Sequence, residues 1–230
     1  MTNPGNQLLS HLPAASRSRL EVLGQAVELR LSESVGVAGA PTDAVLFPIE
    51  GFISLLVQVD GGHATEVGMV GREGMLGIQL ALGVVAQPLN AVVQGPGHAL
   101  RLDAATFRRE LLADAALRTT IHRYAYVLFA QQARAAACLR FHTIEPRLAR
   151  WLLMSHDRAQ ADRFRVTHEF LAFMLGVRRA GVTLAAGALQ RRHFVAYTRG
   201  EVTILDRAGL ADAACSCYAS DQAVYAEQFG

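Results

Sequence analysis

One long stretch without proline or glycine, between Ala113 and Glu145, divides the chain into two parts of different texture. Because proline and glycine interrupt helices, their absence over this length predicts a long helix. Before it, short apolar runs are separated by Gly, Pro and Asp, whereas after it apolar residues recur at helical spacing. We therefore expect a strand-rich first part and a mainly helical second part.

The first part is predicted to begin with a short helical hairpin over residues 7–24, broken at Pro13. Six short apolar or alternating runs then follow, at 27–31, 44–47, 52–59, 65–70, 89–94 and 99–102. Asp60-Gly61-Gly62 and Gly95-Pro96-Gly97 are turn signals, because glycine adopts positive φ without strain. Strands at this spacing favour a β-barrel or β-roll. Asp103 is the expected N-cap of a further helix over 104–112.

Apolar and small residues alternate at spacings of four and three along the predicted long helix. The members of this seam are Leu117, Ile121, Tyr124, Leu128, Gln131, Ala135 and Cys138. A sustained heptad pattern is typical of a helix that pairs with a copy of itself. We therefore predict a dimerisation helix over residues 114–140 and a homodimer. The next helix is expected to begin near Thr143, which places a domain boundary in the break between them.

Charge is distributed unevenly along the chain. Net charge is +2 and every one of the 22 basic residues is arginine. Residues 1–146 contain 11 Arg against 12 acids, whereas residues 147–209 contain 11 Arg against 5 acids, a net of +6. A basic block beside a neutral one indicates that the second part binds a polyanion, with a solvated basic face as the simpler alternative.

Residues 166–205 carry the most specific pattern. Thr167 is the expected cap of a short helix over 168–174, Gly176 lies in the turn that ends it, and a second helix is predicted over 178–191. Two short strands, 195–197 and 201–205, follow and are joined by Arg199-Gly200. Helix, glycine-containing turn, helix and basic hairpin in this order predict a winged helix-turn-helix that binds DNA.

This order of elements resembles the Crp–Fnr family of bacterial transcription regulators over almost the whole chain. The segment from Val166 to Ala185 is similar to the family signature T-x-x-x-[IL]-A-x-x-[LV]-G-x-x-R-x-x-V-x-R, and the matching positions are Thr167, Leu171, Ala172, Gly176, Arg179 and Val182. The resemblance implies an α+β fold with an effector-sensing double-stranded β-helix of the jelly-roll-like, cyclic-nucleotide-binding type over residues 1–113. The dimerisation helix of 114–140 and a DNA-binding domain over 141–230 would complete it.

The function implied is that of a homodimeric, sequence-specific, DNA-binding transcription regulator that acts on an inverted-repeat operator. The residues expected to bind DNA are Thr167, His168, Arg178, Arg179, Thr183 and Arg199. Two departures matter for sequence preference, because Ala180 replaces the acidic residue of many members and Leu184 replaces their second arginine. RNA polymerase and an unidentified small-molecule effector are further candidate partners.

The effector pocket implied by the resemblance also departs from the family pattern. Its candidate residues are Arg72, Glu73, Gly77, Ile78, Asn90, Ala91, Tyr124 and Leu128. Cyclic-nucleotide-binding members use a glutamate and an arginine where this chain has Ile78 and a position near Asn90. Burying a cyclic phosphate without a paired cation is costly, so cyclic AMP is not expected.

Cofactors and catalytic residues are not predicted. No cysteine precedes Cys138, which disfavours an iron–sulfur cluster, and His63 and His98 are the available haem ligands in the roll, although haem is not expected. Cys215 and Cys217 offer two soft ligands without a second pair nearby in sequence, so no metal site is predicted. With three cysteines, no signal peptide pattern and no run of ~20 apolar residues, a cytoplasmic location is expected.

Two alternatives remain open from the sequence. A cupin-like metal-dependent enzyme would need an inward set of histidines and a glutamate, of which only the two histidines of the roll are present. A ligand-binding sensor without DNA binding would be expected to lack the arginines of residues 178–199.

Overall fold

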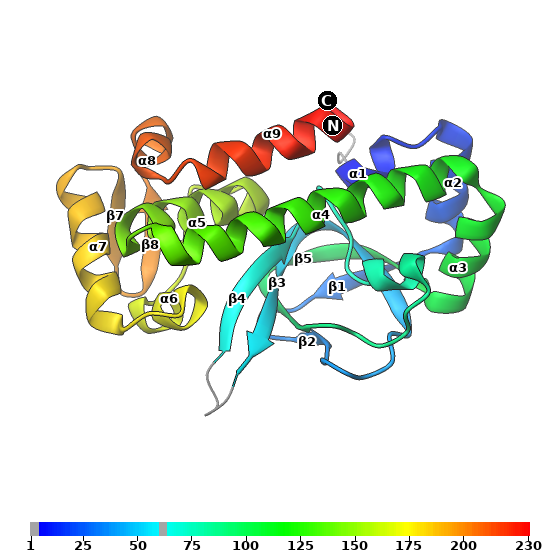
Figure 1. Cartoon of the computed structure of the whole chain (residues 1–230), viewed down its shortest axis with the longest axis horizontal. Helices are drawn as coiled ribbons and strands as arrows, with labels where there is room; N and C mark the ends of the chain where they lie inside the picture. The colour runs from blue at the N-terminus through cyan, green and yellow to red at the C-terminus, as the bar shows by residue number, and fades with distance from the viewer. Residues whose placement is uncertain (1–4, 60–63) are drawn as a thin grey trace. The chain divides into compact units, whose positions relative to one another are not determined.

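The computed structural model describes residues 5–59 and 64–230 (Figure 1). Contacts group the chain into two units, which we describe separately. The first unit comprises Met1–Leu56, Met69–Phe129 and Tyr225–Gly230, and the second comprises Val57–Gly68 and Ala130–Val224. The long helix α4 (Ala115–Phe141) and the last helix α9 (Cys217–Phe229) each contribute residues to both units.

The first unit begins with the predicted helical hairpin, which is confirmed. Helix α1 spans Gln7–Ser10 and α2 spans Ala14–Leu23. The Asn6 side chain caps α1 by accepting from the Leu9 amide, and its own amide group donates to the carbonyls of Pro48 and Gly74. Buried Asn6 therefore fixes the start of the chain against the roll, since all its bonds are satisfied internally.

A five-stranded antiparallel sheet forms the body of this unit, although residues 57–58 and 64–68 of two of its strands are grouped with the second unit. Its strands are β1 (Gln25–Leu29), β2 (Ser34–Gly36), β3 (Ala44–Gln58), β4 (Ala64–Val70) and β5 (Asn90–Asp103). The order is β1-β5-β3-β4, and β2 pairs with β5 outside this path. Asp60-Gly61-Gly62 lies outside the described residues, but the strands on either side of it, β3 and β4, are neighbours in the sheet. The prediction of a strand-rich first part is confirmed.

The prediction of a turn at Gly95-Pro96-Gly97 is wrong, because these residues lie inside β5. Strands β3 and β5 pair over nearly their whole length, and the register shifts three times between Pro48 and Ile53. Gly51 lies at these shifts with φ +75°, and a Cβ atom there would meet the carbonyl oxygens of Gly95 and Pro96. The glycines thus allow two backbones to approach at a bulge, and four predicted strands merge into two long bent ones.

Helices close the first unit around one apolar core. The 3₁₀ helix η2 spans Ile78–Leu82, and α3 (Ala104–Ala113) begins at Asp103, whose side chain accepts from the Thr106 amide as predicted. The core includes aromatic and aliphatic side chains from the sheet, from α3 and from the start of α4, among them Phe47, Leu102, Phe107, Leu117, Ile121 and Tyr124.

Over its first half, the predicted dimer seam therefore packs against the core of its own unit. Leu117, Ile121 and Tyr124 are at most 2% exposed and belong to the core of their own unit, and half-buried Leu128 packs against it. Cys138 is likewise buried within the second unit. The exposed side of α4 instead presents Tyr126 and Phe129, at 54% and 73% exposure, followed by exposed Ala133 and Ala136. A helix can satisfy a heptad pattern against its own sheet, and here the strongest apolar positions do so.

The second unit is mainly helical, as predicted. Its elements after α4 are α5 (Ile144–Ala159), β6 (Arg163–Arg165), α6 (His168–Leu175), α7 (Arg179–Arg191), β7 (Val195–Thr198), β8 (Glu201–Ile204) and α8 (Arg207–Ala213), followed by the start of α9. The strands form a three-stranded antiparallel sheet in the order β6-β8-β7. Strand β6 was not predicted, because Arg163-Phe164-Arg165 has only one apolar residue.

The bulge at Gly51 gives a test of the fold. Gly51→Ala should lower the free energy of unfolding by more than 2 kcal/mol, roughly the sum of a left-handed backbone penalty of ~1 kcal/mol and a backbone clash. Gly39 has a similar φ of +83° but nothing within 4 Å of a Cβ atom, so Gly39→Ala isolates the backbone penalty. Denaturant unfolding of both variants checks this expectation, and equal losses would contradict the close approach of β3 and β5.

Candidate nucleic-acid interface

The second unit is organised by the packing of α7 on α5. Helix α7 buries four residues along one side, Val182, Ala185, Ala186 and Leu189. Helix α5 buries its own apolar side, including Leu148, Trp151 and Leu152. Gly181 lies so close to Ile144 that a Cβ atom there would meet the end of that side chain. Small residues on α7 therefore let the two helices approach closely, and the opposite side of α7 faces solvent.

Helices α6 and α7 form the predicted helix-turn-helix. The Thr167 hydroxyl caps α6 by accepting from the Phe170 amide at 3.1 Å, and Gly176 ends the helix with φ 62°. The two helices bend by 110° at their short break, within the range typical of this motif.

No single helix of the described chain is long and apolar enough to cross a membrane. Among the described residues, the bent pair α6 and α7 is the only pair of helices that together reaches the length and apolar composition of a span.

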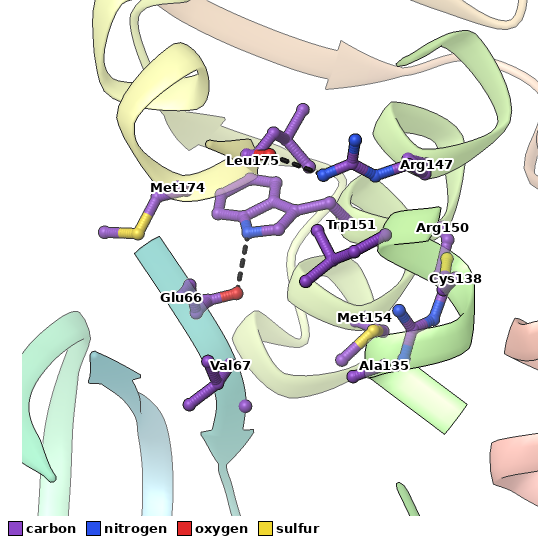
Figure 2. A pocket seen from close by; sticks show the side chains of 12 residues that line it. Glu66, Val67, Ala135, Cys138, Arg147, Arg150, Trp151, Met154, Met174 and Leu175 are labelled. Atoms are coloured by element: carbon purple, nitrogen blue, oxygen red, sulfur yellow. Dashed lines mark hydrogen bonds between the residues drawn. The ribbon is translucent and has the colours of Figure 1, made fainter. Parts of the chain in front are cut away.

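Two residues of α5 hold α6 in place, and Figure 2 shows one of their contacts, at the C-terminal end of α6. The Arg147 guanidinium donates to the Leu175 carbonyl, one of the carbonyls that a helix leaves without an internal partner. Trp151 packs edge-on against Phe170, and its Nε1 donates to Glu66 Oε1 at 2.9 Å. Arg147, Trp151 and Glu66 line a small cavity together with Met174. No pattern in the sequence pointed to this role of Arg147, because it depends on a carbonyl 28 residues away.

The exposed side of α7 begins with the predicted DNA-binding residues. Arg178 is the N-cap and Arg179 the first residue of the helix, and both side chains are exposed, as is Thr183 one turn later. In the part of the chain that the structure describes, neither arginine forms an ion pair, and Glu169 is not a partner of Arg179. Their guanidinium groups therefore remain available to a ligand beyond the protein.

His168 connects three elements of this surface. Its Nδ1 lies 3.2 Å from the Thr183 hydroxyl, which also donates to the Arg179 carbonyl, and its ring stands edge-on to Tyr197 of β7. Burial lowers the pKa of His168 below the ordinary 6.5, and the charge of Arg179 lowers it further. The imidazole is therefore neutral at pH 7 and positions the Thr183 side chain without adding charge.

The wing lies beside the start of α6. Arg199 and Gly200 connect β7 and β8 with φ of 51° and 82°, the pair of positive values that a tight two-residue hairpin requires. The Gly200 carbonyl accepts from the Val166 amide at 2.8 Å, directly before Thr167. The structure thus brings onto adjoining segments the six residues expected to bind DNA, Thr167, His168, Arg178, Arg179, Thr183 and Arg199, and their contact with DNA stays a prediction.

The predicted effector-pocket residues occupy a different kind of site in the first unit. Gly77 and Ile78 begin η2, whereas Asn90 and buried Ala91 begin β5. Asn90 accepts from the Ala38 amide, and Glu73 accepts from the Gly71 amide within the turn that also contains Arg72. Tyr124 is in the core, with Leu128 and Ile78 packed against it. These three side chains therefore serve the core of the first unit, and the effector pocket stays a prediction.

Of the two histidines of the roll that a haem or cupin site would use, the structure describes only His98. The His98 side chain is 61% exposed and lies 3.4 Å from Glu50 on the outside of the sheet. His63 lies outside the described residues. The expected absence of cyclic AMP, haem and an iron–sulfur cluster stays a prediction.

Comparison with known proteins identifies the motif. Residues 146–213 match the model of the Crp-like helix-turn-helix domain. The chain carries a Crp-like helix-turn-helix domain. The sequence prediction of this domain is confirmed, and its match covers α5 to α8. No curated protein sequence matches the chain.

Solved structures show where else the fold occurs. FixK2 from Bradyrhizobium japonicum has a TM-score of 0.71 at 13% identity, over 84% of this chain and 98% of its own. A Crp/Fnr-family regulator from Eubacterium rectale has a TM-score of 0.69 at 15% identity, over 89% and 96%. The c-di-GMP-responsive regulator CLP from Xanthomonas campestris has a TM-score of 0.63 at 16% identity, over 84% and 99%. The expected α+β fold with a C-terminal Crp-like domain is confirmed.

The position of His168 gives a test of the interface. Because burial and the charge of Arg179 both disfavour the imidazolium, the folded protein should lose stability as pH falls through 6.5 towards the lower folded pKa. We expect NMR titration to give a His168 pKa below 6.5 in the wild type and a value closer to 6.5 in Arg179→Ala. Arg191→Ala, another exposed arginine of α7, should leave it unchanged; equal shifts would contradict the assigned geometry.

Proposed function

We propose that this chain is a homodimeric, sequence-specific, DNA-binding transcription regulator of the Crp–Fnr type. The observation that carries the proposal is the set of exposed, unpaired arginines at the start of α7, beside a basic wing. The N-terminal residues of a recognition helix reach base edges in the major groove. Arginine donates two hydrogen bonds to guanine, and a threonine can meet a base edge through its hydroxyl or methyl group.

Different basic residues should have different roles in this proposal. Arg179 lies on the helix itself and matches the arginine of the family signature, so we assign it to base recognition. Arg199 lies at the tip of the hairpin, where a contact with the phosphate backbone is expected. Ala180 and Leu184 are the exposed neighbours of Arg179 and Thr183 and can offer only apolar contacts. Sequence preference should therefore differ from that of regulators with charged residues at these positions.

Arg179→Ala should reduce discrimination at one symmetric pair of operator positions by about 1–3 kcal/mol. Arg179→Lys keeps the charge but not the two-pronged geometry, so it should also lose discrimination while keeping the salt dependence. Arg199→Ala should weaken binding to all DNA sequences alike and lower by about one unit the slope of log affinity against log salt concentration. Binding to a randomised DNA pool at several salt concentrations measures both effects. An unchanged base preference in Arg179→Ala would contradict base recognition by this residue.

For the dimer we propose the exposed side of α4, where Tyr126, Phe129, Ala133 and Ala136 follow one another at spacings of three and four. This stripe supports pairing better than the buried half of the original seam, because exposed aromatic side chains are available to a second copy. Two recognition helices would then meet an inverted repeat with half-sites about one helical turn, ~10 bp, apart.

Phe129→Asp should weaken the dimer by two orders of magnitude or more, about 3 kcal/mol, because it places two carboxylates in an apolar contact. Leu112→Asp changes a side chain of α3 that is 80% exposed and lies off the stripe, so it should sediment like the wild type. Analytical ultracentrifugation of both variants tests the assignment. A normal dimer in Phe129→Asp would exclude this side of α4 as the interface.

We further propose that the first unit senses an effector other than cyclic AMP. In the family alignment Ile78 replaces the glutamate that binds the ribose, and the arginine that binds the cyclic phosphate falls near Asn90. A buried phosphate would therefore lack the cation that it needs. The regulator from Xanthomonas campestris, with the same fold, is described as c-di-GMP-responsive. This supports a role for the fold in coupling a ligand to DNA binding while the chemistry of the ligand varies.

A further inference from the structure

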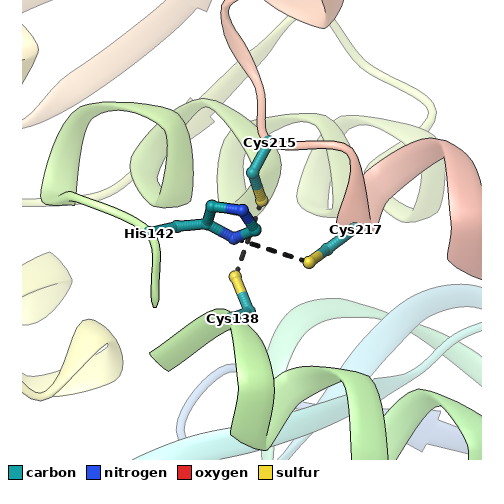
Figure 3. A group of neighbouring side chains, drawn as sticks. All are labelled: Cys138, His142, Cys215 and Cys217. Carbon is teal, nitrogen blue, oxygen red and sulfur yellow. Dashed lines mark hydrogen bonds between the residues drawn. The ribbon is translucent and has the colours of Figure 1, made fainter. Parts of the chain in front are cut away.

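Four metal-ligating side chains of the second unit converge at one place (Figure 3). Cys138 lies in the last turn of α4 and His142 follows one turn later, directly after the helix ends. Cys215 lies in the connection between α8 and α9, and Cys217 is the first residue of α9. All three cysteines of the chain are thus in this cluster, although 77 residues separate Cys138 from Cys215.

The distances between the ligand atoms fit a tetrahedral metal site. Cys138 Sγ lies 3.5 Å from Cys215 Sγ, and Cys217 Sγ lies 3.6 Å from His142 Nδ1. The four ligand atoms all lie within 4.8 Å of one another. With bonds of about 2.3 Å from zinc to sulfur and about 2.0 Å to nitrogen, ligand atoms of a tetrahedron are separated by about 3.5–3.8 Å. An ion can therefore bind at the centre with only small side-chain movements.

The surroundings of the cluster suit a permanent structural ion. The three cysteines are at most 7% exposed, and His142 is half-buried. Three thiols this close to one another form only weak hydrogen bonds, because a thiol is both a weak donor and a weak acceptor. Four protein ligands also fill a tetrahedral zinc shell completely, and such closed shells are typical of structural rather than catalytic sites.

A positive charge lies beside the cluster. Arg150 lines the same small cavity as Cys138. Its ion pair with Asp221 at 2.6 Å fixes the position of the guanidinium. A cation next to a cysteine favours the thiolate form that metal ions require.

From this geometry we propose that Cys138, His142, Cys215 and Cys217 bind one zinc ion, which ties the end of α4 and the α4–α5 break to the start of α9. The ligands are imidazole and thiolate, the set that zinc prefers among common divalent ions. Binding releases the thiol protons and adds stability to the folded state, because the four ligands are not gathered in the unfolded chain. The site does not depend on DNA binding.

The first measurement uses the wild-type full-length protein purified under reducing conditions. Mass spectrometry of the metal content should find a single zinc ion per chain after dialysis against a weak chelator. Removal of zinc with a strong chelator should lower the melting temperature, and added Zn²⁺ should restore it. Loading with Co²⁺ instead should give the intense visible absorption of tetrahedral cobalt with thiolate ligands.

Variants then assign the ligands. Cys217→Ser and His142→Ala should each retain at least tenfold less zinc at the same chelator concentration, and Cys217→Ser should also lose thiolate-to-cobalt absorption. His122→Ala is the matched control, since His122 is an exposed histidine of the same helix, and it should retain zinc like the wild type. Circular dichroism identifies any variant that fails to fold, in which case the wild-type cobalt spectrum decides.

Three results would overturn the proposal. The first is a wild-type protein that takes up neither zinc nor cobalt. The second is iron with acid-labile sulfide in place of zinc, which would indicate a cluster of another kind. The third is a Cys138–Cys215 disulfide in protein alkylated without reduction, since disulfide sulfurs do not supply the two thiolates that the site needs.

Discussion

The close packing of α7 on α5 is the interaction on which the Crp-like domain depends. Four inward residues of α7, two of them alanine, bury one side of the helix, and Gly181 lets it approach Ile144. Because one side is committed to the core, the other side must face solvent. Arg179 and Thr183 lie on that side. The orientation of the recognition surface is thus a consequence of where the apolar residues of α7 are placed.

Polar contacts then set the details of that surface. Arg147 holds the carbonyl end of α6, and Thr167 caps its other end. His168 joins α6, α7 and the wing through Thr183 and Tyr197, and its low pKa keeps it uncharged at pH 7. Arg178 and Arg179 therefore supply the positive charge of this surface, while His168 fixes the position of the Thr183 side chain. This division allows affinity for a polyanion and choice of sequence to be altered by different substitutions.

The proposed zinc site and the proposed dimer both concern α4, but at different residues. The exposed stripe from Tyr126 to Ala136 offers a surface to a second copy, whereas Cys138 and His142 turn inward at the end of the helix. An ion at the cluster would tie the connection between α4 and α5 to the start of α9.

Local patterns in the sequence were enough by themselves to predict the Crp-like domain. A capping threonine, a glycine with positive φ, a 3.6-residue apolar repeat and a two-residue hairpin lie within forty residues of one another. Such features act over one or two turns, so they can be identified without a fold. The tertiary structure alone decided what depends on contacts between distant residues. It placed Gly95-Pro96-Gly97 inside a strand because Gly51 approaches from another one. The first half of the α4 seam packs in the core of its own unit, and Cys138 and His142 lie next to Cys215 and Cys217. Spacing along a chain does not reveal which distant segments pack together, so neither arrangement could be predicted from the sequence.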